Sequence, residues 1–466
     1  MLFSSMTFVF MFLPIVCAVY LLSKKELHNA VLLIASIIFY AWGEPRYLAI
    51  MLLTIIINYF GALLIEKSEK YKKLSLILVL AANLGFLIFF KYFNFLLDNV
   101  NNLFHSHIHP LDIIMPIGIS FYTFQAVSYI IDVYRNEVKA QKDIYKLALF
   151  ICLFPQLTTG PIVKYHDIEE QIDNREVKFE KVSLGVKRFI IGLSKKMLIA
   201  NTLGSAADKI FSQNPDSFSP LIAWLGAISY SFQLLFDFSG YSDMAIGLGL
   251  IFGFKFMENF NYPYISKSIT EFWRRWHMSL STWFKQYVYI PLGGNKNGAV
   301  RTYINLFIVF LLTGIWHGAN WNFILWGLWN GFFIIIEKMT GWHKETENIW
   351  INILKHIYVI FIFILGWVMF RSDNTAYAWI YIKNMFGFVK VSPAEISYTM
   401  SYYIDTIVIL AFVAAILCST QVFNKMLQVE NKTGKFFINI WLLILFILSS
   451  ASIAASTYNP FIYFRF

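Results

Sequence analysis

Long apolar runs recur along the whole chain and are separated by short polar stretches. The first run covers residues 2–22, and many later runs approach the roughly 20 residues that an α-helix needs to cross a bilayer. No comparably long polar segment interrupts the pattern. It therefore predicts an all-α polytopic membrane protein with a single membrane domain over residues 1–466.

The polar stretches differ in charge, and the difference predicts a topology. Basic residues gather in 23–28, 66–73, 134–146, 164–196, 255–301 and 424–435, whereas 98–112 and 212–219 contain no Lys or Arg. Loops rich in Lys and Arg stay in the cytoplasm. We therefore expect about ten crossing helices in a bacterial cytoplasmic (inner) membrane, with both chain termini on the periplasmic side.

Two apolar runs are interrupted in a way that predicts re-entrant hairpins. Only 36 residues lie between Arg301 and Lys338, too few for two comfortable spans. A helix from Arg301 to His317 rises about 24 Å, against a hydrocarbon core of about 30 Å. The segment is therefore expected to enter as two short helices and turn near "GIWHGAN". The stretch "LFPQLTTGPIVKYHDI" (153–168), with two prolines and a glycine, predicts a second re-entrant loop.

Composition agrees with a membrane protein. Apolar residues make up 58% of the chain and charged residues 14%, whereas a soluble domain is about a quarter charged. The net charge of +10 is interpreted as a topology signal, so no nucleic-acid partner is expected. Three cysteines lie far apart in apolar runs and predict buried thiols. The stretch "HSHIH" (105–109) is interpreted as a polar outer loop, and no metal site is expected.

His317 stands inside the run "TGIWHGANW" (313–321). An ionisable side chain within a membrane segment is a candidate functional group. Gly314 and Gly318 allow a helix break and close packing, and Trp316 and Trp321 are expected to wall a cavity. The alternative is a structural histidine that donates to a backbone carbonyl.

The stretch 259–298 predicts an amphipathic helix at the cytoplasmic interface. Its aromatic stripe, at helical spacing, consists of Trp273, Trp276, Leu280, Trp283, Phe284 and Tyr287. Ser268 or Thr270 is expected to cap the helix, and Arg274 and Arg275 fall away from the stripe. These arginines either meet lipid phosphates or hold a phosphorylated donor. His277 points in another direction and is either structural or catalytic.

Asp237 and Asp243 are embedded in the apolar run 232–250. Carboxylates are costly there unless they are paired or face water. They are expected to orient His277 or His317, or to satisfy an arginine of the interfacial helix.

Several blocks resemble the membrane-bound O-acyltransferase (MBOAT) family, in particular its branch that O-acetylates polysaccharides. The blocks are "PIGISFYTFQ", "IDVYR", "LFPQLTTGPIVKY", "FDFSGYSDMAIGLG", "NYPYISKSITEFWRRWHMSLSTWFKQYVYIPLGGN" and "LTGIWHGANWNFILWG". They cover roughly residues 110–340. The resemblance implies a fold of crossing helices and re-entrant hairpins around a central funnel. It places the family's invariant histidine on His317 and its second histidine on His277.

The resemblance also implies an acyltransferase reaction. The donor is expected to be acetyl-CoA, used as a substrate, with no bound cofactor. His317 suits a general base that takes a hydroxyl proton and returns it to the leaving thiolate. Asn320 or freed backbone N–H groups are expected to stabilise the oxyanion, and Arg274 and Arg275 to bind the donor.

The favoured acceptor is peptidoglycan, reached through a separate periplasmic O-acetyltransferase partner because the chain has no secreted hydrolase-like domain. An abundance of Ile, Phe, Lys and Asn suggests an AT-rich genome and argues mildly against an alginate producer. The alternative acceptor is alginate or another exopolysaccharide. A transporter for a lipid-linked sugar or acyl carrier is the alternative of another class, but the internal repeats that would favour it are not evident.

The C-terminal stretch "STYNPFIYFRF" (456–466) is rich in aromatic residues. Such a tail is either an interfacial aromatic belt or a functional segment. "PFIYFRF" resembles the short Tyr-containing C-terminal motif of this acyltransferase branch. That resemblance implies that Tyr463 accepts the acetyl group as a phenolic ester and passes it on, after deprotonation by His317.

Overall fold

The computed structural model describes residues 1–466 except 159, 391–397, 424–430, 456–457 and 461–466. Every regular element in the described part of the chain is a helix. These residues form two compact units, Met1–Phe189 with Tyr241–Glu258 (unit 1) and Ile190–Gly240 with Asn259–Phe466 (unit 2). The expectation of one membrane domain over the whole chain stays a prediction.

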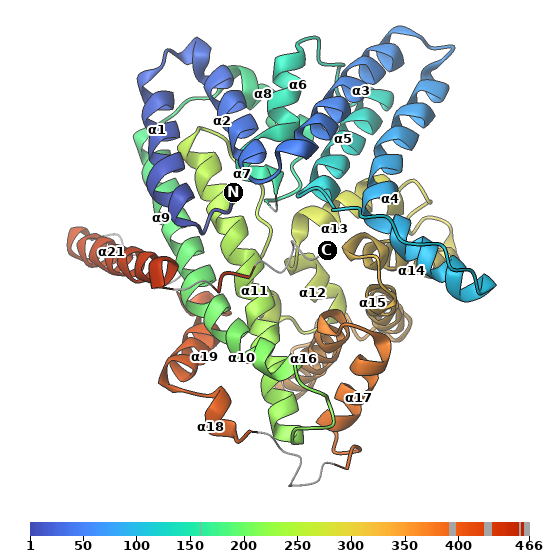
Figure 1. Cartoon of the computed structure of the whole chain (residues 1–466), viewed down its shortest axis with the longest axis vertical. Helices are drawn as coiled ribbons and strands as arrows, with labels where there is room; N and C mark the ends of the chain where they lie inside the picture. The colour runs from blue at the N-terminus through green and yellow to red at the C-terminus, as the bar shows by residue number, and fades with distance from the viewer. Residues whose placement is uncertain (159, 391–397, 424–430, 456–457, 461–466) are drawn as a thin grey trace. The chain divides into compact units, whose positions relative to one another are not determined.

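Unit 1 contains the first eight α-helices and most of the ninth (Figure 1). They are α1 (Leu13–Leu22), α2 (His28–Gly43), α3 (Leu48–Lys67), α4 (Lys72–Phe104), α5 (Ile119–Tyr134), α6 (Ile144–Cys152), α7 (Phe154–Leu157), α8 (Tyr165–Asn174) and α9 (Phe179–Ser194). The four-residue α7 and the buried, non-helical chain after it confirm that the run 153–168 is interrupted.

Unit 2 begins at the end of α9 and contains the remaining helices. They are the π-helical turn η4 (Lys195–Ala200), α10 (Asn201–Phe211), the first part of α11 (Pro220–Ile251), α12 (Ile269–Arg275), α13 (Met278–Phe284), the π-helical turn η6 (Lys285–Tyr289), α14 (Gly298–His317), α15 (Trp321–Thr340), α16 (Ile349–Arg371), α17 (Thr375–Met385), α18 (Met400–Tyr403), α19 (Thr406–Cys418) and α21 (Lys432–Ala455).

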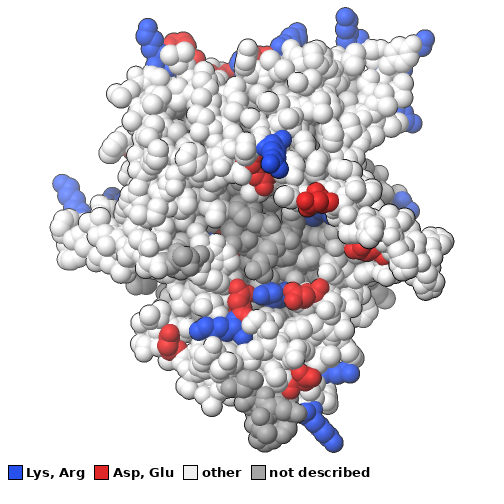
Figure 2. Space-filling view, in the orientation of Figure 1, with Lys and Arg blue, Asp and Glu red and all other residues white. Residues whose placement is uncertain are grey.

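The helices confirm a polytopic membrane protein. Among the described residues, eight helices are long and apolar enough to cross a bilayer, and Phe8–Leu22 and Thr406–Cys418 are shorter apolar helices. Large apolar side chains stand on the surface, for example Leu22 at 87% and Trp350 at 76% exposure. Most of the visible surface in Figure 2 carries no charged residue. Such a surface suits lipid tails rather than water.

α14 and α15 form the hairpin that was expected around His317, and they pack against each other (Figure 1). Each helix has 20 residues, so both are longer than the short re-entrant helices predicted from the positions of the flanking charges. The close packing depends on glycine. A Cβ on Gly314 would lie 2.4 Å from the Phe323 carbonyl oxygen, and one on Gly327 would lie 2.4 Å from the Phe310 carbonyl oxygen.

The segment 259–298 differs from the single interfacial helix that was predicted. It forms α12 and α13, separated at Trp276 and His277, and then η6. The six residues of the aromatic stripe are all buried. The stripe therefore packs inside the protein and does not face lipid. The break after α12 divides it between two short helices, and its rings contact other helices, for example Trp273 with Phe310 of α14 and Trp276 with Trp367 of α16. Ser268 caps α12 as predicted, since its hydroxyl accepts from the Glu271 N–H at 2.9 Å.

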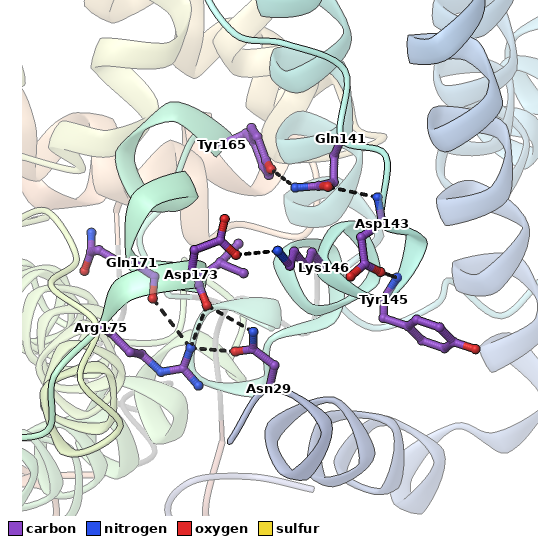
Figure 3. A network of polar contacts seen from close by, with 10 residues as sticks. Asn29, Gln141, Asp143, Tyr145, Lys146, Tyr165, Gln171, Asp173 and Arg175 are labelled. Atoms are coloured by element: carbon purple, nitrogen blue, oxygen red, sulfur yellow. Dashed lines mark hydrogen bonds and ion pairs between the residues drawn. The ribbon is translucent and has the colours of Figure 1, made fainter. Parts of the chain in front are cut away.

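A polar network in unit 1 satisfies carbonyl groups at the C-terminal ends of two helices, and Figure 3 shows the part of it around Asn29 and Arg175. The Arg175 guanidinium donates to the Ile172 carbonyl at the end of α8 (3.2 Å) and to the Phe252 carbonyl just after α11 (3.1 Å). Asn29 accepts from Arg175 and donates to the same Ile172 carbonyl at 3.0 Å. The last carbonyls of a helix lack partners within it, and here a buried cation satisfies them.

The glycine contact between α14 and α15 gives a stability prediction. Gly327→Ala is expected to destabilise the protein by about 1–3 kcal/mol, because the new methyl group meets backbone atoms that cannot move away. The measurement is the thermal unfolding midpoint of purified protein in detergent. Gly85→Ala is the matched control, since a Cβ there meets nothing within 4 Å. Equal midpoints for the two variants would contradict the packing argument.

Candidate acyl-transfer site

His317 is the last residue of α14, and Gly318 ends the helix with an extended backbone. The imidazole is 2% exposed and lies among aromatic rings. Ring centroids are 5.0 Å away for Trp316, 4.9 Å for Trp326 and 5.2 Å for Phe370. Trp326 and Phe370, from α15 and α16, were missed by the sequence analysis because nothing in a single sequence shows that three helices meet there.

Trp321, which was expected to wall the cavity, is 53% exposed. The residue lies at the first position of α15. Trp316 is buried and its ring contacts His317, whereas Trp321 is largely exposed.

His277 occupies the break between α12 and α13 in a left-handed conformation, with φ of 44°. Its Nδ1 lies 3.0 Å from the side-chain oxygen of Asn259. The backbone N–H of Ser279 donates to the same oxygen at 3.3 Å. Because that oxygen already accepts from an N–H group, Nδ1 of His277 is the donor, and Nε2 is the nitrogen that carries the lone pair.

Trp316 joins the two histidines into one cluster. Its ring contacts His317, and its centroid lies 6.0 Å from the His277 centroid. The histidine cluster is defined here as His277, Trp316, His317, Trp326 and Phe370. Burial lowers the pKa of His277 from an ordinary value of 6.5 to about 3. His277 is therefore neutral at physiological pH.

Glu337 of α15 fixes the segment that carries His277. Its buried carboxylate accepts from the backbone N–H groups of Ile269 (2.6 Å) and Thr270 (2.9 Å) at the start of α12. A carboxylate at a helix N-terminus accepts from unpaired N–H groups, and its negative charge is attracted to the positive end of the helix dipole. Trp273 adds a second tie, donating to Asn330 at 3.1 Å. The hairpin that carries His317 therefore also positions α12.

The two arginines predicted to bind the donor have different surroundings. Arg274 is exposed. The Arg275 guanidinium donates to the Glu271 carboxylate at 2.8 Å and to the Asn261 carbonyl at 3.1 Å.

Asn320 caps α15, because its side-chain oxygen accepts from the Asn322 N–H at 3.0 Å. Its amide nitrogen donates to the Asp373 carbonyl at 3.1 Å. The structure thus gives Asn320 partners within the fold, and its role at the oxyanion stays a prediction.

The two membrane carboxylates pair with basic residues, but not with those that were expected. Asp237 lies 2.6 Å from the Lys196 ammonium, and both side chains are 1% exposed. Asp243, in unit 1, lies 2.9 Å from Arg188. Neither partner belongs to the segment 259–298. Both come from the basic stretch 164–196, which carried no sign in the sequence that two of its cations are buried partners.

Tyr463 and the histidines of 105–109 are the remaining candidates. Tyr463 lies outside the described residues. The three histidines of 105–109 are exposed, and Ser106 between the first two is half-buried. In the described part of the chain, no group of three or more His, Cys, Asp or Glu side chains is placed to hold a metal ion.

Comparison with known proteins gives the same picture. A model of the membrane-bound O-acyltransferase family matches residues 119–372. The chain is 40% identical to a probable alginate O-acetylase of Pseudomonas putida over the full length of both proteins. It is 38% identical to a peptidoglycan O-acetyltransferase of Helicobacter pylori, over 87% of this chain and 84% of the relative. It is 32% identical to a teichoic acid D-alanyltransferase of Bacillus subtilis, over 57% of this chain and 71% of the relative.

An all-helical membrane protein with two buried histidines beside helix breaks has the parts that acyl transfer needs, a proton acceptor shielded from bulk water. The protein is a multi-span membrane acyltransferase. It belongs to the membrane-bound O-acyltransferase family, which removes the transporter alternative.

The low pKa of His277 gives a prediction about pH. The unfolded chain protonates this histidine below about pH 6.5, and the folded protein does not until about pH 3. The free energy of unfolding therefore falls as the pH falls through this window, by up to about 1.4 kcal/mol per pH unit. His277→Asn is expected to flatten this dependence, since Asn tolerates the left-handed backbone and does not titrate. Thermal midpoints in detergent at several pH values between ~7 and ~5 measure it.

The exposed His107 supplies the control for this experiment. His107→Asn is expected to keep the wild-type slope, because it makes the same substitution at an exposed loop position, away from the buried ring of His277. A His277→Asn protein with the wild-type slope would show that His277 does not stay neutral.

Proposed function

We propose that the protein transfers acetyl groups from cytoplasmic acetyl-CoA, through the membrane, for O-acetylation of a cell-envelope or secreted polysaccharide. The observation that carries the proposal is the position of His317, buried among aromatic rings at the point where α14 ends. Membership of the acyltransferase family supports the reaction class. We place the protein in a bacterial cytoplasmic membrane, with both termini on the periplasmic side.

In the proposed reaction, His317 acts as the general base. Its neutral imidazole takes the proton of an acceptor hydroxyl while the oxygen attacks the thioester carbonyl carbon. The carbon–sulfur bond then breaks, and the imidazolium returns the proton to the departing thiolate. The aromatic surroundings exclude water, which limits hydrolysis of the thioester.

His277 is the second proposed site residue. Asn259 holds its Nδ1–H, so the basic Nε2 is fixed in direction by a hydrogen bond on the other side of the ring. We propose that His277 orients or polarises a reacting group on the donor side of Trp316.

Arg274 and Arg275 are the proposed contacts for the phosphates of coenzyme A. Both are at the end of α12, three and two residues before His277. Arg274 is exposed and available, whereas Arg275 would have to share its guanidinium with Glu271. The alternative partner for both is a lipid phosphate.

The comparisons change the favoured acceptor. Peptidoglycan was the main expectation, with alginate or another exopolysaccharide as the alternative. A relative named as an alginate O-acetylase aligns over the full length of both chains, and the relative named as a peptidoglycan O-acetyltransferase aligns over 87% of this one. We therefore propose an exopolysaccharide acceptor and keep peptidoglycan as the second candidate.

The final transfer is proposed to need a separate periplasmic partner protein. Tyr463 is proposed to attack the thioester of acetyl-CoA after His317 takes its phenolic proton, which releases the thiol, and then to pass the acetyl group to that partner. A phenol with a pKa near 10 is a better leaving group than a sugar hydroxyl, so a phenolic ester is a reasonable intermediate. Mass analysis of the protein after acetyl-CoA treatment is expected to show one acetyl group on Tyr463, absent in His317→Ala.

The essential role of His317 is tested by His317→Ala. We expect transfer of acetyl groups to fall by at least about a hundredfold, since a general base contributes about that much, while the protein still folds and inserts. The measurement is O-acetyl content of secreted polysaccharide and of peptidoglycan in cells that carry each variant. His107→Ala, in an exposed loop, is the control.

The same measurement separates the two acceptors. Loss of acetyl groups from the secreted polysaccharide alone supports the main proposal, and loss from peptidoglycan alone supports the second candidate. Near wild-type acetylation of both in His317→Ala would remove His317 from the mechanism.

The donor site is tested by replacing Arg274 and Arg275 together with Gln. We expect KM for acetyl-CoA to rise about tenfold or more, because charge-assisted bonds to phosphate are lost. Lys285→Gln is the matched control, since Lys285 is an exposed cation that follows α13. Unchanged KM in the double variant would leave the arginines as lipid contacts.

A further inference from the structure

The segment Tyr458–Pro460, which follows α21, lies against the helix formed by η4 and α10. The Lys196 ammonium donates to the Pro460 carbonyl. The Asn201 amide donates to the Tyr458 carbonyl at 3.4 Å. The Tyr458 hydroxyl donates to the Asp208 carboxylate at 2.6 Å. Three polar side chains of one helix therefore hold one short segment that is 250 to 264 residues away in sequence.

The π-helical turn η4 puts these side chains on one face. In an α-helix of 3.6 residues per turn, residues five apart point in different directions. In η4, whose bonds run from i to i+5, the Asn201 N–H bonds to the Lys196 carbonyl, so the two residues lie one turn apart. Asp208 follows seven residues after Asn201, which is two α-helical turns. Lys196, Asn201 and Asp208 thus form a line, called here the docking strip.

Both ends of the docking strip are fixed by ion pairs within unit 2. Lys196 pairs with the buried Asp237 of α11. Asp208 lies 2.7 Å from Arg371 at the end of α16. Since the charged groups are already held, they present their remaining hydrogen-bonding capacity to the segment without having to be ordered by it.

The same ion pairs lead to the histidine cluster. Phe238, next to Asp237, packs edge-on against His277 with centroids 4.7 Å apart. Phe370, next to Arg371, packs against His317 with centroids 5.2 Å apart. Each end of the docking strip is therefore linked to one histidine through its ion-pair partner and the aromatic residue next to that partner in sequence.

We propose that Lys196, Asn201 and Asp208 are positioning residues that hold the C-terminal segment at Tyr458–Pro460 and so set its register for acyl transfer at the histidine cluster. The proposal rests on the acetyl-transfer function proposed above. It requires that loss of docking slows transfer without weakening donor binding, because no residue of the strip belongs to the proposed donor site. A strip that merely fastens the segment would leave the transfer rate unchanged.

Two variants remove docking by different contacts. Tyr458→Phe deletes only the hydroxyl that donates to Asp208. The double variant Lys196→Met with Asp237→Val removes the ammonium that donates to Pro460, together with its partner, because a buried charge left alone would itself destabilise the protein. Tyr145→Phe, at a tyrosine that is 72% exposed, and Asp216→Asn, at an exposed carboxylate after α10, are the controls.

Docking is measured without reference to activity. The purified full-length chain is treated with a carboxypeptidase, and intact mass is followed over time. Both docking variants are expected to lose Tyr458–Pro460 about tenfold faster than the wild type, since one hydrogen bond to a charged group has been removed. The two controls are expected to match the wild type. Trimming at the wild-type rate in both docking variants would overturn the docking.

Positioning is measured by steady-state acetyl transfer on the same proteins. We expect kcat to fall about tenfold, with KM for acetyl-CoA and the thermal midpoint unchanged. Faster trimming with unchanged kcat would show that the strip only fastens the segment, and would overturn the positioning role. A wild-type protein that transfers no acetyl group would instead refute the proposed function, while the trimming rates would still report on docking.

Discussion

A polar side chain that is buried in a membrane protein must find its partner within the protein, because neither lipid nor a dry interior offers one. The buried pair of Lys196 and Asp237 shows the constraint most directly. An isolated charge at either position would be costly, so the two residues fix the approach of α11 to the helix that contains η4. Gly240 allows that approach, since a Cβ there would lie 2.7 Å from the Gly192 carbonyl.

The same constraint explains how the candidate site is built. Each interruption of a helix frees backbone groups, and a polar side chain from another element satisfies them. Glu337 accepts from the N–H groups that begin α12, and Asn259 accepts from the backbone and from His277 at the break before α13. The helix break at His277 is thus stabilised by contacts that also fix the position of the buried ring. Rigid placement of the histidines and a locally irregular backbone are therefore compatible.

Two physical features characterise the site: water is excluded from His317, and the ring of His277 is held in one orientation. Aromatic rings around His317 remove bulk water, and the Asn259 hydrogen bond fixes the tautomer of His277. Neither feature needs a metal or a bound cofactor to be understood from the residues present. The proposed reaction requires a neutral imidazole that faces a hydroxyl and a thioester. It therefore depends on how these groups are positioned more than on unusual reactivity of any of them.

The amino-acid sequence by itself determined the class of the fold, because apolar runs of this length and composition are stable as helices that cross a bilayer. It also predicted the helix break near His317 and limited the cap of α12 to Ser268 or Thr270, since helix breaks and caps depend on local sequence. The partners of Asp237, the burial of the aromatic stripe and the meeting of His277 with His317 through Trp316 were decided only by the tertiary structure. These features depend on which helices approach each other, and contacts such as that between Lys196 and Pro460 join residues that no local pattern connects. The register of the docking strip depends likewise on a π-helical turn, which the 3.6-residue period of the sequence does not reveal.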